Sequence, residues 1–374
     1  MSALPVPVAA ATGEPSGLCL NTVLSAGTPR AIPSLPANTM TPNPPLHRPG
    51  NASEHAEIAE IAESATLASL GAQVLVRGWL SANNIVFAAA ADDESGAALV
   101  DTGYVSHAAQ TLALVDQALG GVPLRRVVNT HLHSDHCGGN AALARRWPGL
   151  QISVPVASRD KLQPWDESRL SYRDTDQHCE PFEAHHFLAD GDTLRLGHHD
   201  WQVHAAPGHD PDAVLLFEPT TATLISGDAL WENRLAIIFP ELSGEPGFDA
   251  AHQALDLIER LQPRRVLPGH GEPFTGVAAA LAASRQRLRA FAAAPMKHRQ
   301  HATRALVVYH LLEHRVRPRD ALVHWIATTP IFVRALQCAD DPPRARALAQ
   351  ATIDRLLTDG VLVAREGNVL MAGD

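Results

Sequence analysis

A layered α/β fold is predicted by three features of the chain. Short apolar runs bounded by glycine, proline, asparagine or aspartate recur from residue 73 to residue 270, which is typical of strands. Between some of these runs, apolar residues recur at helical spacing, as in Leu112, Val115 and Leu119. Strands interspersed with helices over about 200 residues favour packed α/β layers. The 45% share of hydrophobic residues is sufficient for the core that such layers need.

The expected elements follow in chain order. A helix is expected near 53–68, where Ser53 can cap a run rich in alanine and glutamate. Further helices are expected around 112–119, from Asn140 onward and at roughly 249–261. Strands are expected at 74–80, 83–90, 97–103, 124–130, 152–156, 193–197, 201–206, 213–217, 222–228 and 264–270.

The chain of 374 residues exceeds one average domain, and its composition divides it into three parts. Residues 1–50 contain ten of the 28 prolines, no aromatic residue and only three charged residues. Such a segment can bury little apolar area, so residues 1–60 are predicted to form a flexible extension. Residues 61–295 carry the α/β pattern and form the predicted main domain.

The last part, residues 296–374, predicts a helical module. Helices are expected at 302–314, 321–327, 331–336 and 344–360, followed by a hairpin over 360–370. Helices followed by a terminal hairpin are typical of a winged-helix domain. From 297 to 374 eleven Lys and Arg stand against eight Asp and Glu, with no dense basic stripe. We therefore expect this module to pack on the main domain, narrow a substrate entrance or form a homodimer contact.

Charge and cysteine usage limit the functional classes. A formal net charge of −10 argues against a general nucleic-acid binder, because phosphate contacts need basic surface. The four cysteines lie far apart and form no CxxC pair, which favours a reducing compartment. The first residues lack the pattern of a secretory signal, and no run approaches the roughly 20 apolar residues of a membrane span. We expect a cytoplasmic protein without membrane contact.

The central motif is THLHSDHCGG at 130–139, directly after an expected buried strand. In an extended turn, His131 and His133 point the same way, because side chains two positions apart share a face. Asp135 and His136 extend the cluster to three imidazoles and one carboxylate within six residues. Nitrogen and oxygen ligands of this kind suit Zn²⁺, and also Fe or Mn.

Three further motifs each end an expected strand beside a glycine, where functional loops are commonly positioned. They are APGH at 206–209, ISGD at 225–228 and LPGH at 267–270. A single GH or GD pair is more often an ordinary turn. Their order and spacing after the HxHxDH motif make the set a strong signal, which adds His209, Asp228 and His270 to the candidate ligands.

This ordered set resembles the metallo-β-lactamase superfamily over about residues 73–275. The resemblance implies an αββα sandwich, with a site for two metals at one edge of the two sheets, and makes 61–295 the catalytic domain. It also implies the ligand roles. The first metal would be bound by His131, His133 and His209, the second by Asp135, His136 and His270, and Asp228 would bridge them.

Within the superfamily, the chain looks most like the glyoxalase II, lactonase and lactamase-like branch. β-Lactamases commonly have cysteine at the position of Asp228, and flavo-diiron proteins have glutamate at that of His133. Only 42 positions separate Asp228 from His270, too few for the insertion of the β-CASP nucleases. The C-terminal helices strengthen the similarity to lactamase-like proteins with a winged-helix domain. The chain departs from the family pattern at Asp210–Pro211–Asp212, because Thr or Ser often follows PGH in the family. For this reason the resemblance does not assign a substrate to this chain.

The resemblance implies a hydrolase in which a hydroxide bridging two divalent metals, zinc first and iron or manganese as alternatives, attacks a small ester, thioester or lactone. Asp135 is the candidate catalytic residue, because besides binding metal it can orient the nucleophile or pass a proton. A metal-dependent ribonuclease or phosphodiesterase is the alternative enzyme, so nucleic acid stays open as a partner beside a small-molecule substrate. The third hypothesis is a regulator that binds metal without enzymatic activity.

Overall fold

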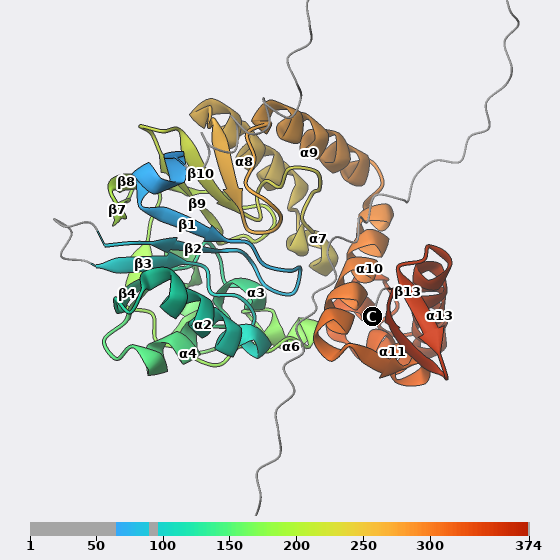
Figure 1. The fold of residues 1–374 in the computed structure, drawn as a ribbon. Coiled ribbons are helices and arrows are strands. Elements are labelled where there is room, and N and C mark those ends of the chain that lie inside the picture. The colour runs from blue at the N-terminus through green and yellow to red at the C-terminus, as the bar shows by residue number, and fades with distance from the viewer. Residues whose placement is uncertain (1–64, 90–95, 373–374) are drawn as a thin grey trace, which may run out of the picture.

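The computed structural model describes residues 65–89 and 96–372 (Figure 1). The expected extension over 1–60 and the helix start at Ser53 lie outside the described residues. Residues 65–70 are helical, at the end of the range where a helix is expected. None of the helices in the described part of the chain combines the length and apolarity needed to cross a bilayer.

The first sheet has six strands in the order β1-β2-β3-β4-β5-β6. Its first three strands pair antiparallel, and β3, β4, β5 and β6 pair in parallel. The strands are β1 (Ala72–Leu75), β2 (Asn84–Phe87), β3 (Ala97–Val100), β4 (Leu124–Val128), β5 (Gln151–Pro155) and β6 (His186–Leu188).

The second sheet has five strands in the order β11-β10-β9-β8-β7. Only β10 and β11 pair in parallel; the other neighbours are antiparallel. The strands are β7 (Thr193–Leu196), β8 (His199–Ala205), β9 (Val214–Glu218), β10 (Thr223–Gly227) and β11 (Arg265–Pro268).

Alternating side chains hold the layers together. On β4, Val127 belongs to the core beneath the outer helices, whereas Val128 belongs to the core between the two sheets. On β11, Val266 and Leu267 divide in the same way. Because successive strand residues point to opposite faces, a strand that is covered on both faces reads as a continuous apolar run.

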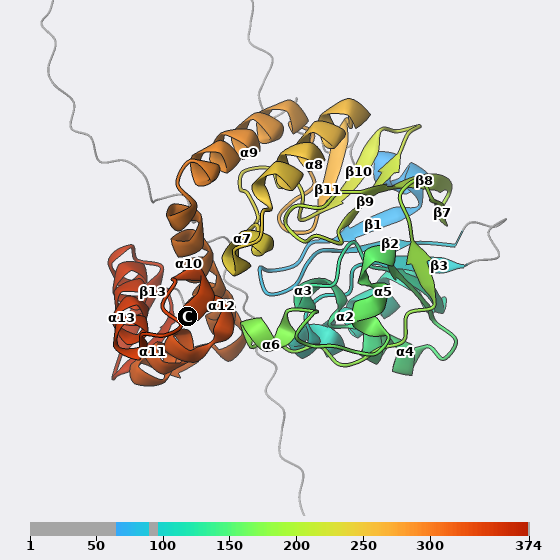
Figure 2. The same ribbon diagram turned by 180° about the vertical axis from the view of Figure 1, so that it is seen from behind.

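Helices cover the outer face of each sheet, as Figures 1 and 2 show. Side chains of α2 and α4 pack on the first sheet, and those of α8 and α9 pack on the second. The predicted αββα sandwich is therefore confirmed. The helices of this part are α2 (Ala108–Leu119), α3 (Ser134–Cys137), α4 (Asn140–Arg146), α5 (Arg159–Leu162), α6 (Tyr172–Thr175), α7 (Phe239–Ser243), α8 (Phe248–Leu261) and α9 (Val277–Ala292), with short 3₁₀ turns at Val105–His107 and Val156–Ser158.

The prediction of one strand over 74–80 is wrong, because β1 ends at Leu75. The next residues fold back on themselves: the backbone N–H of Arg77 donates to Oδ1 of Asn83 at 2.9 Å, and that of Ser81 donates to the carbonyl of Gly78 at 3.1 Å. The helices α3, α5, α6, α7 and α9 and the three-residue strand β6 were not expected. The loop over 76–83 carries Trp79.

After α9 the chain forms a helical region with a small sheet, which confirms the expected helical C-terminal part. Its three strands have the order β12-β14-β13. That it is a winged-helix domain stays a prediction. The elements are α10 (Pro295–His314), β12 (Val316–Pro318), α11 (Arg319–Thr328), α12 (Pro330–Ala335), α13 (Pro342–Thr358), β13 (Leu362–Arg365) and β14 (Asn368–Met371).

Candidate metal centre

All seven predicted ligands lie together where strands of both sheets end. The segment after β4 carries His131 and His133 and continues into the one-turn helix α3, which carries Asp135 and His136. The other three residues follow β8, β10 and β11. Six of the seven residues are buried and Asp135 is partly exposed. The structure brings the seven side chains together, and their binding of metal stays a prediction.

The first group of three, here called the inner triad, consists of His131, His133 and His209. Nε2 of His131 lies 3.1 Å from Nδ1 of His133, which lies 2.8 Å from Nε2 of His209. The rings are close and nearly perpendicular, with centroids 4.6 to 5.1 Å apart. Three ring nitrogens therefore converge on one point.

The second group, the outer triad, consists of Asp135, His136 and His270. Nε2 of His270 lies 3.0 Å from Oδ2 of Asp135, and Nε2 of His136 lies 3.9 Å from the same oxygen. Asp228 lies between the two triads: its Oδ1 is 3.4 Å from Nε2 of His136, and its Oδ2 is 3.4 Å from Nε2 of His209. One carboxylate thus presents an oxygen to each triad.

Hydrogen bonds outside the cluster decide the tautomers of three imidazoles. Nδ1 of His209 lies 2.6 Å from the carbonyl of Ile237, which can only accept. Nδ1 of His136 lies 2.8 Å from the carboxylate of Asp101. Nδ1 of His131 lies 3.1 Å from the hydroxyl of Thr130, which donates its own hydrogen to Asp101 and therefore accepts from His131. Each Nδ1 therefore carries the hydrogen. The Nε2 lone pair of each ring faces the cluster.

These lone pairs fit a cation. Nε2 of His136 is buried and has no hydrogen-bond partner among the described residues. A proton on Nδ1 of His133 could satisfy the Nε2 lone pair of His131 or that of His209, but not both. A Cβ on Gly269 would lie 2.3 Å from Oδ1 of Asp228, so only glycine lets the chain pass this close to the cluster. Imidazole and carboxylate donors suit zinc, iron and manganese.

The pKa values differ between the triads. Burial lowers the pKa of His131 well below its usual range and that of His133 and His209 to about 4. Burial also opposes protonation of His136, but the carboxylates of Asp228, Asp101 and Asp135 outweigh it and raise its pKa well above the usual value. The inner triad is therefore neutral, whereas the metal-free outer triad attracts a proton.

Asp101 orients residues of both triads. Its Oδ1 accepts from the backbone N–H of Thr130 at 2.9 Å, and its Oδ2 accepts from the Thr130 hydroxyl at 2.8 Å and from Nδ1 of His136. Partners of this kind fix the orientation and tautomer of metal-binding histidines.

Aromatic side chains form the rim. Trp79 stacks on His270, with centroids 5.3 Å apart and planes at 6°, and the indole of Trp231 donates to Oδ1 of Asp228 at 3.1 Å. Phe239 packs on His133 at 4.4 Å. The guanidinium of Arg234 lies 4.6 Å from the Trp79 ring centre. No motif in the sequence marks Trp79 or Arg234 as part of the site.

The C-terminal helix α10 also contacts the centre. The hydroxyl of Tyr309 donates to the carbonyl of Leu80 at 3.1 Å, and its ring packs edge-on against Tyr104. Burial, followed by the charge of Asp135, raises the pKa of Tyr309 well above its usual value. The C-terminal region therefore borders the candidate site, and that it narrows a substrate entrance stays a prediction.

The two extra carboxylates after PGH have separate partners. Oδ2 of Asp210 lies 3.5 Å from Nε2 of His133, on the side of the ring away from the inner triad. Asp212 pairs with Lys161 at 2.5 Å and accepts from Ser158 at 2.8 Å. Asp210 can thus support His133 as Asp101 supports His136.

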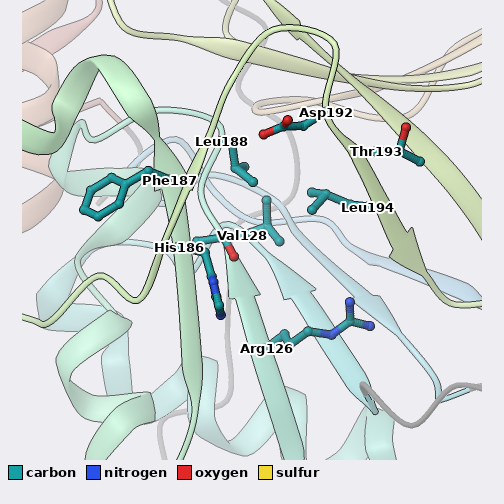
Figure 3. Close-up of a pocket in the computed structure, with 9 residues that line it drawn as sticks. Arg126, Val128, His186, Phe187, Leu188, Asp192, Thr193 and Leu194 are labelled. Atoms are coloured by element: carbon teal, nitrogen blue, oxygen red, sulfur yellow. The ribbon is translucent and has the colours of Figure 1, made fainter.

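A cavity of about 400 Å³ lies elsewhere, between the edges of the two sheets (Figure 3). None of the seven candidate ligands lines it, so it is separate from the metal centre. Its lining residues are Arg126, Val128, Ser153, His186, Phe187, Leu188, Asp192, Thr193 and Leu194.

The chain is similar to one protein family and to proteins named as hydrolases. Residues 77–270 match the profile of the metallo-beta-lactamase superfamily. A probable metallo-hydrolase, YflN of Bacillus subtilis, is 24% identical over 223 residues, which cover 52% of this chain and 82% of that protein. A hydroxyacylglutathione hydrolase of Xanthomonas oryzae is 30% identical over 202 residues, 54% of this chain and 65% of that protein. The chain thus spans slightly less than two thirds of this second relative.

A solved structure of a metallo-beta-lactamase family protein from Thermus thermophilus has a TM-score of 0.50 with this chain. The identity is 19%, and the overlap covers 80% of this chain and 98% of the other. At this identity the likeness concerns the fold.

Proposed function

Because the chain belongs to the metallo-beta-lactamase superfamily, we propose that it is a metal-dependent hydrolase that cleaves a small ester, thioester or lactone. The observation that carries the proposal is the convergence of five imidazoles and two carboxylates, with lone pairs directed into the cluster. The inner triad would hold one cation, the outer triad a second, and Asp228 would contact both.

Two divalent cations, zinc in our proposal with iron or manganese as alternatives, would lower the pKa of a bound water and polarise the scissile carbonyl. The protein's own residues supply orientation and charge. Asp101 and the carbonyl of Ile237 fix the rings of His136 and His209. The aromatic rim of Trp79, Trp231 and Phe239 excludes water from the reacting group and offers apolar contact to the substrate.

Asp135 is the proposed catalytic residue. Burial opposes its ionisation, but the charge of His136 and the hydrogen bond from His270 outweigh burial and lower its pKa. It is also the one candidate ligand with partial exposure. An ionised carboxylate at the open side of the cluster can accept a hydrogen bond from the attacking water and orient it toward the substrate.

A substrate panel tests the function. Metal-loaded protein is offered S-lactoylglutathione, an acyl-homoserine lactone, p-nitrophenyl esters, a bis-p-nitrophenyl phosphodiester and single-stranded RNA. We expect hydrolysis of at least one ester, thioester or lactone, loss of that activity on chelation and recovery when metal returns. Hydrolysis that survives in verified metal-free protein would falsify the mechanism.

Phosphodiester cleavage is the second candidate, and one sequence feature favours it. Although the chain is acidic, no Asp or Glu occurs between Glu272 and Glu313, where six Lys and Arg lie. Such residues attract phosphates where no acidic partner compensates them, and of the six, Arg285 is compensated by Asp256 and Glu259. Cleavage of RNA or the phosphodiester alone in the panel would support this candidate. Metal binding without turnover of any substrate would favour a regulator.

A further inference from the structure

One peptide group connects a candidate metal ligand with a histidine of the C-terminal helix. The carbonyl oxygen of Ile237 accepts from Nδ1 of His209 at 2.6 Å. The N–H of the same peptide, which belongs to Ile238, donates to Nε2 of His298 on α10 at 3.1 Å. Because the C=O and N–H of a trans peptide point in opposite directions, the two histidines lie on opposite sides of it.

Both hydrogen bonds have only one possible direction. A carbonyl only accepts, so Nδ1 of His209 carries the hydrogen and its Nε2 lone pair faces His133 at 2.8 Å. A backbone N–H only donates, so Nε2 of His298 is the acceptor. The peptide therefore needs His298 in one tautomer and holds His209 in the tautomer that can bind metal.

Burial makes the acceptor on His298 hard to replace. Its side chain is fully buried and Ile238 is 2% exposed, so solvent does not supply another acceptor. Two rings hold the imidazole, Phe248 on α8 at 5.3 Å and Phe291 on α9 at 5.1 Å. Without an acceptor the buried N–H would be unpaired, and rotation of the peptide toward another partner would take the Ile237 carbonyl away from His209.

We propose that His298 is a positioning residue of the metal centre, which holds the 237–238 peptide so that His209 presents Nε2 to the inner triad. The C-terminal helix thereby takes part in metal binding without contacting the metal. The inference rests on the metal site of the proposed function. It adds a residue that lies 89 positions after His209 and outside the matched family region.

Two polar substitutions separate positioning from packing. In His298→Gln the side-chain oxygen can reach the place of Nε2, whereas in His298→Asn the oxygen is one bond too short. We expect the Gln variant to bind metal with nearly wild-type affinity and the Asn variant to bind it about 10- to 100-fold more weakly, as for other partners of metal-binding histidines. Affinity is measured by competition with a chromophoric chelator, and metal content by elemental analysis.

The matched control is His310→Asn on the same helix. His310 is also buried and stacks on Trp325 at 3.8 Å, away from the centre. This variant should lose thermal stability but keep wild-type metal affinity. Equal metal affinity of the two His298 variants would overturn the inference, and so would a folded Gln variant that loses metal. A wild-type protein that binds no metal would instead contradict the proposed function, and the inference with it.

Discussion

The inner triad and the outer triad lie at the same strand ends but differ in chemistry and in cover. The inner triad has three imidazoles, whereas the outer triad combines two imidazoles with the carboxylate of Asp135. Phe239 packs on the inner side, and the 38% exposed Trp79 covers His270 on the outer side. A neutral, buried triad would bind a cation through lone pairs alone, while the outer triad adds charge and is nearer to solvent. We expect the outer cation to exchange faster.

The largest expected effect comes from Asp228→Ala, because this residue faces both triads. Removal of partners outside the ligand set already costs about 10- to 100-fold in affinity or activity, so loss of this ligand should cost more than about 100-fold in turnover. Turnover and metal content of the purified variant are the measurements, with the surface variant Asp256→Ala on α8 as control. Two tightly bound ions in the Asp228 variant would show that Asp228 joins neither triad.

The pH dependence of metal-free protein should separate the triads. His133 and His209 have folded pKa values of about 4 against an unfolded value near 6.5, so their contribution to stability is complete above pH 6.5 and is lost as pH falls through 4. His136 has a raised pKa, so its contribution is complete below pH 6.5 and is lost as pH rises through its folded pKa.

For His133 and His209 each contribution should be on the order of 1 to 3 kcal/mol. Urea unfolding of metal-free protein from pH 4 to 9 measures it. In a plot of unfolding free energy against pH, His209→Gln should flatten the acid limb, and His136→Gln should flatten the alkaline limb. The division into two triads would be wrong if both variants changed the same limb.

A smaller effect is expected when the aromatic cover of each triad is removed in turn. Aromatic pairs contribute about 0.5 to 1.5 kcal/mol, which corresponds to about 2- to 12-fold in affinity. Trp79→Ala should weaken the outer cation and leave the inner one unchanged, and Phe239→Ala should do the reverse. Stepwise metal titration resolves the two events. Identical titrations of the two variants would argue against the idea that Trp79 covers only the outer triad and Phe239 only the inner triad.

The smallest effect is expected at the ion pair between Arg334 on α12 and Asp174 on α6. Both side chains are about one third exposed, so solvent screens the pair, and Arg334→Ala should cost at most about 1 kcal/mol of folding free energy. Metal affinity of both triads should stay at the wild-type value. A change in metal affinity would show that the surface of the C-terminal region also influences the two triads.

Packed α/β layers and the candidate ligands at strand ends could be read from local patterns, whereas the αββα sandwich and the grouping of the ligands were implied by the resemblance to the metallo-β-lactamase superfamily. Apolar strands end in glycine beside histidine or aspartate, and the ends of such strands meet at one edge. The helix α9 was missed because its run of alanines and arginines has no sharp apolar stripe, and β6 because it has only three residues.

The rim and the supporting residues could not be read in this way. Trp79 lies 191 positions before His270, within a run that alternates like a strand, and only the fold-back of the 76–83 loop brings the two rings together. His298 is one of twenty histidines and has no glycine or strand end beside it. Its partner is a backbone N–H, which leaves no signature in the identity of any residue.

The helix α7 has a consequence for protein engineering. Phe239 lies on His133 of the centre, while Leu242, three positions later, belongs to the core of the C-terminal helices. A chimera joined at residue 295 would therefore place a foreign core against the wall of the candidate metal centre. Exchange of C-terminal regions between relatives should preserve turnover only when the segment over 237–243 is exchanged with them.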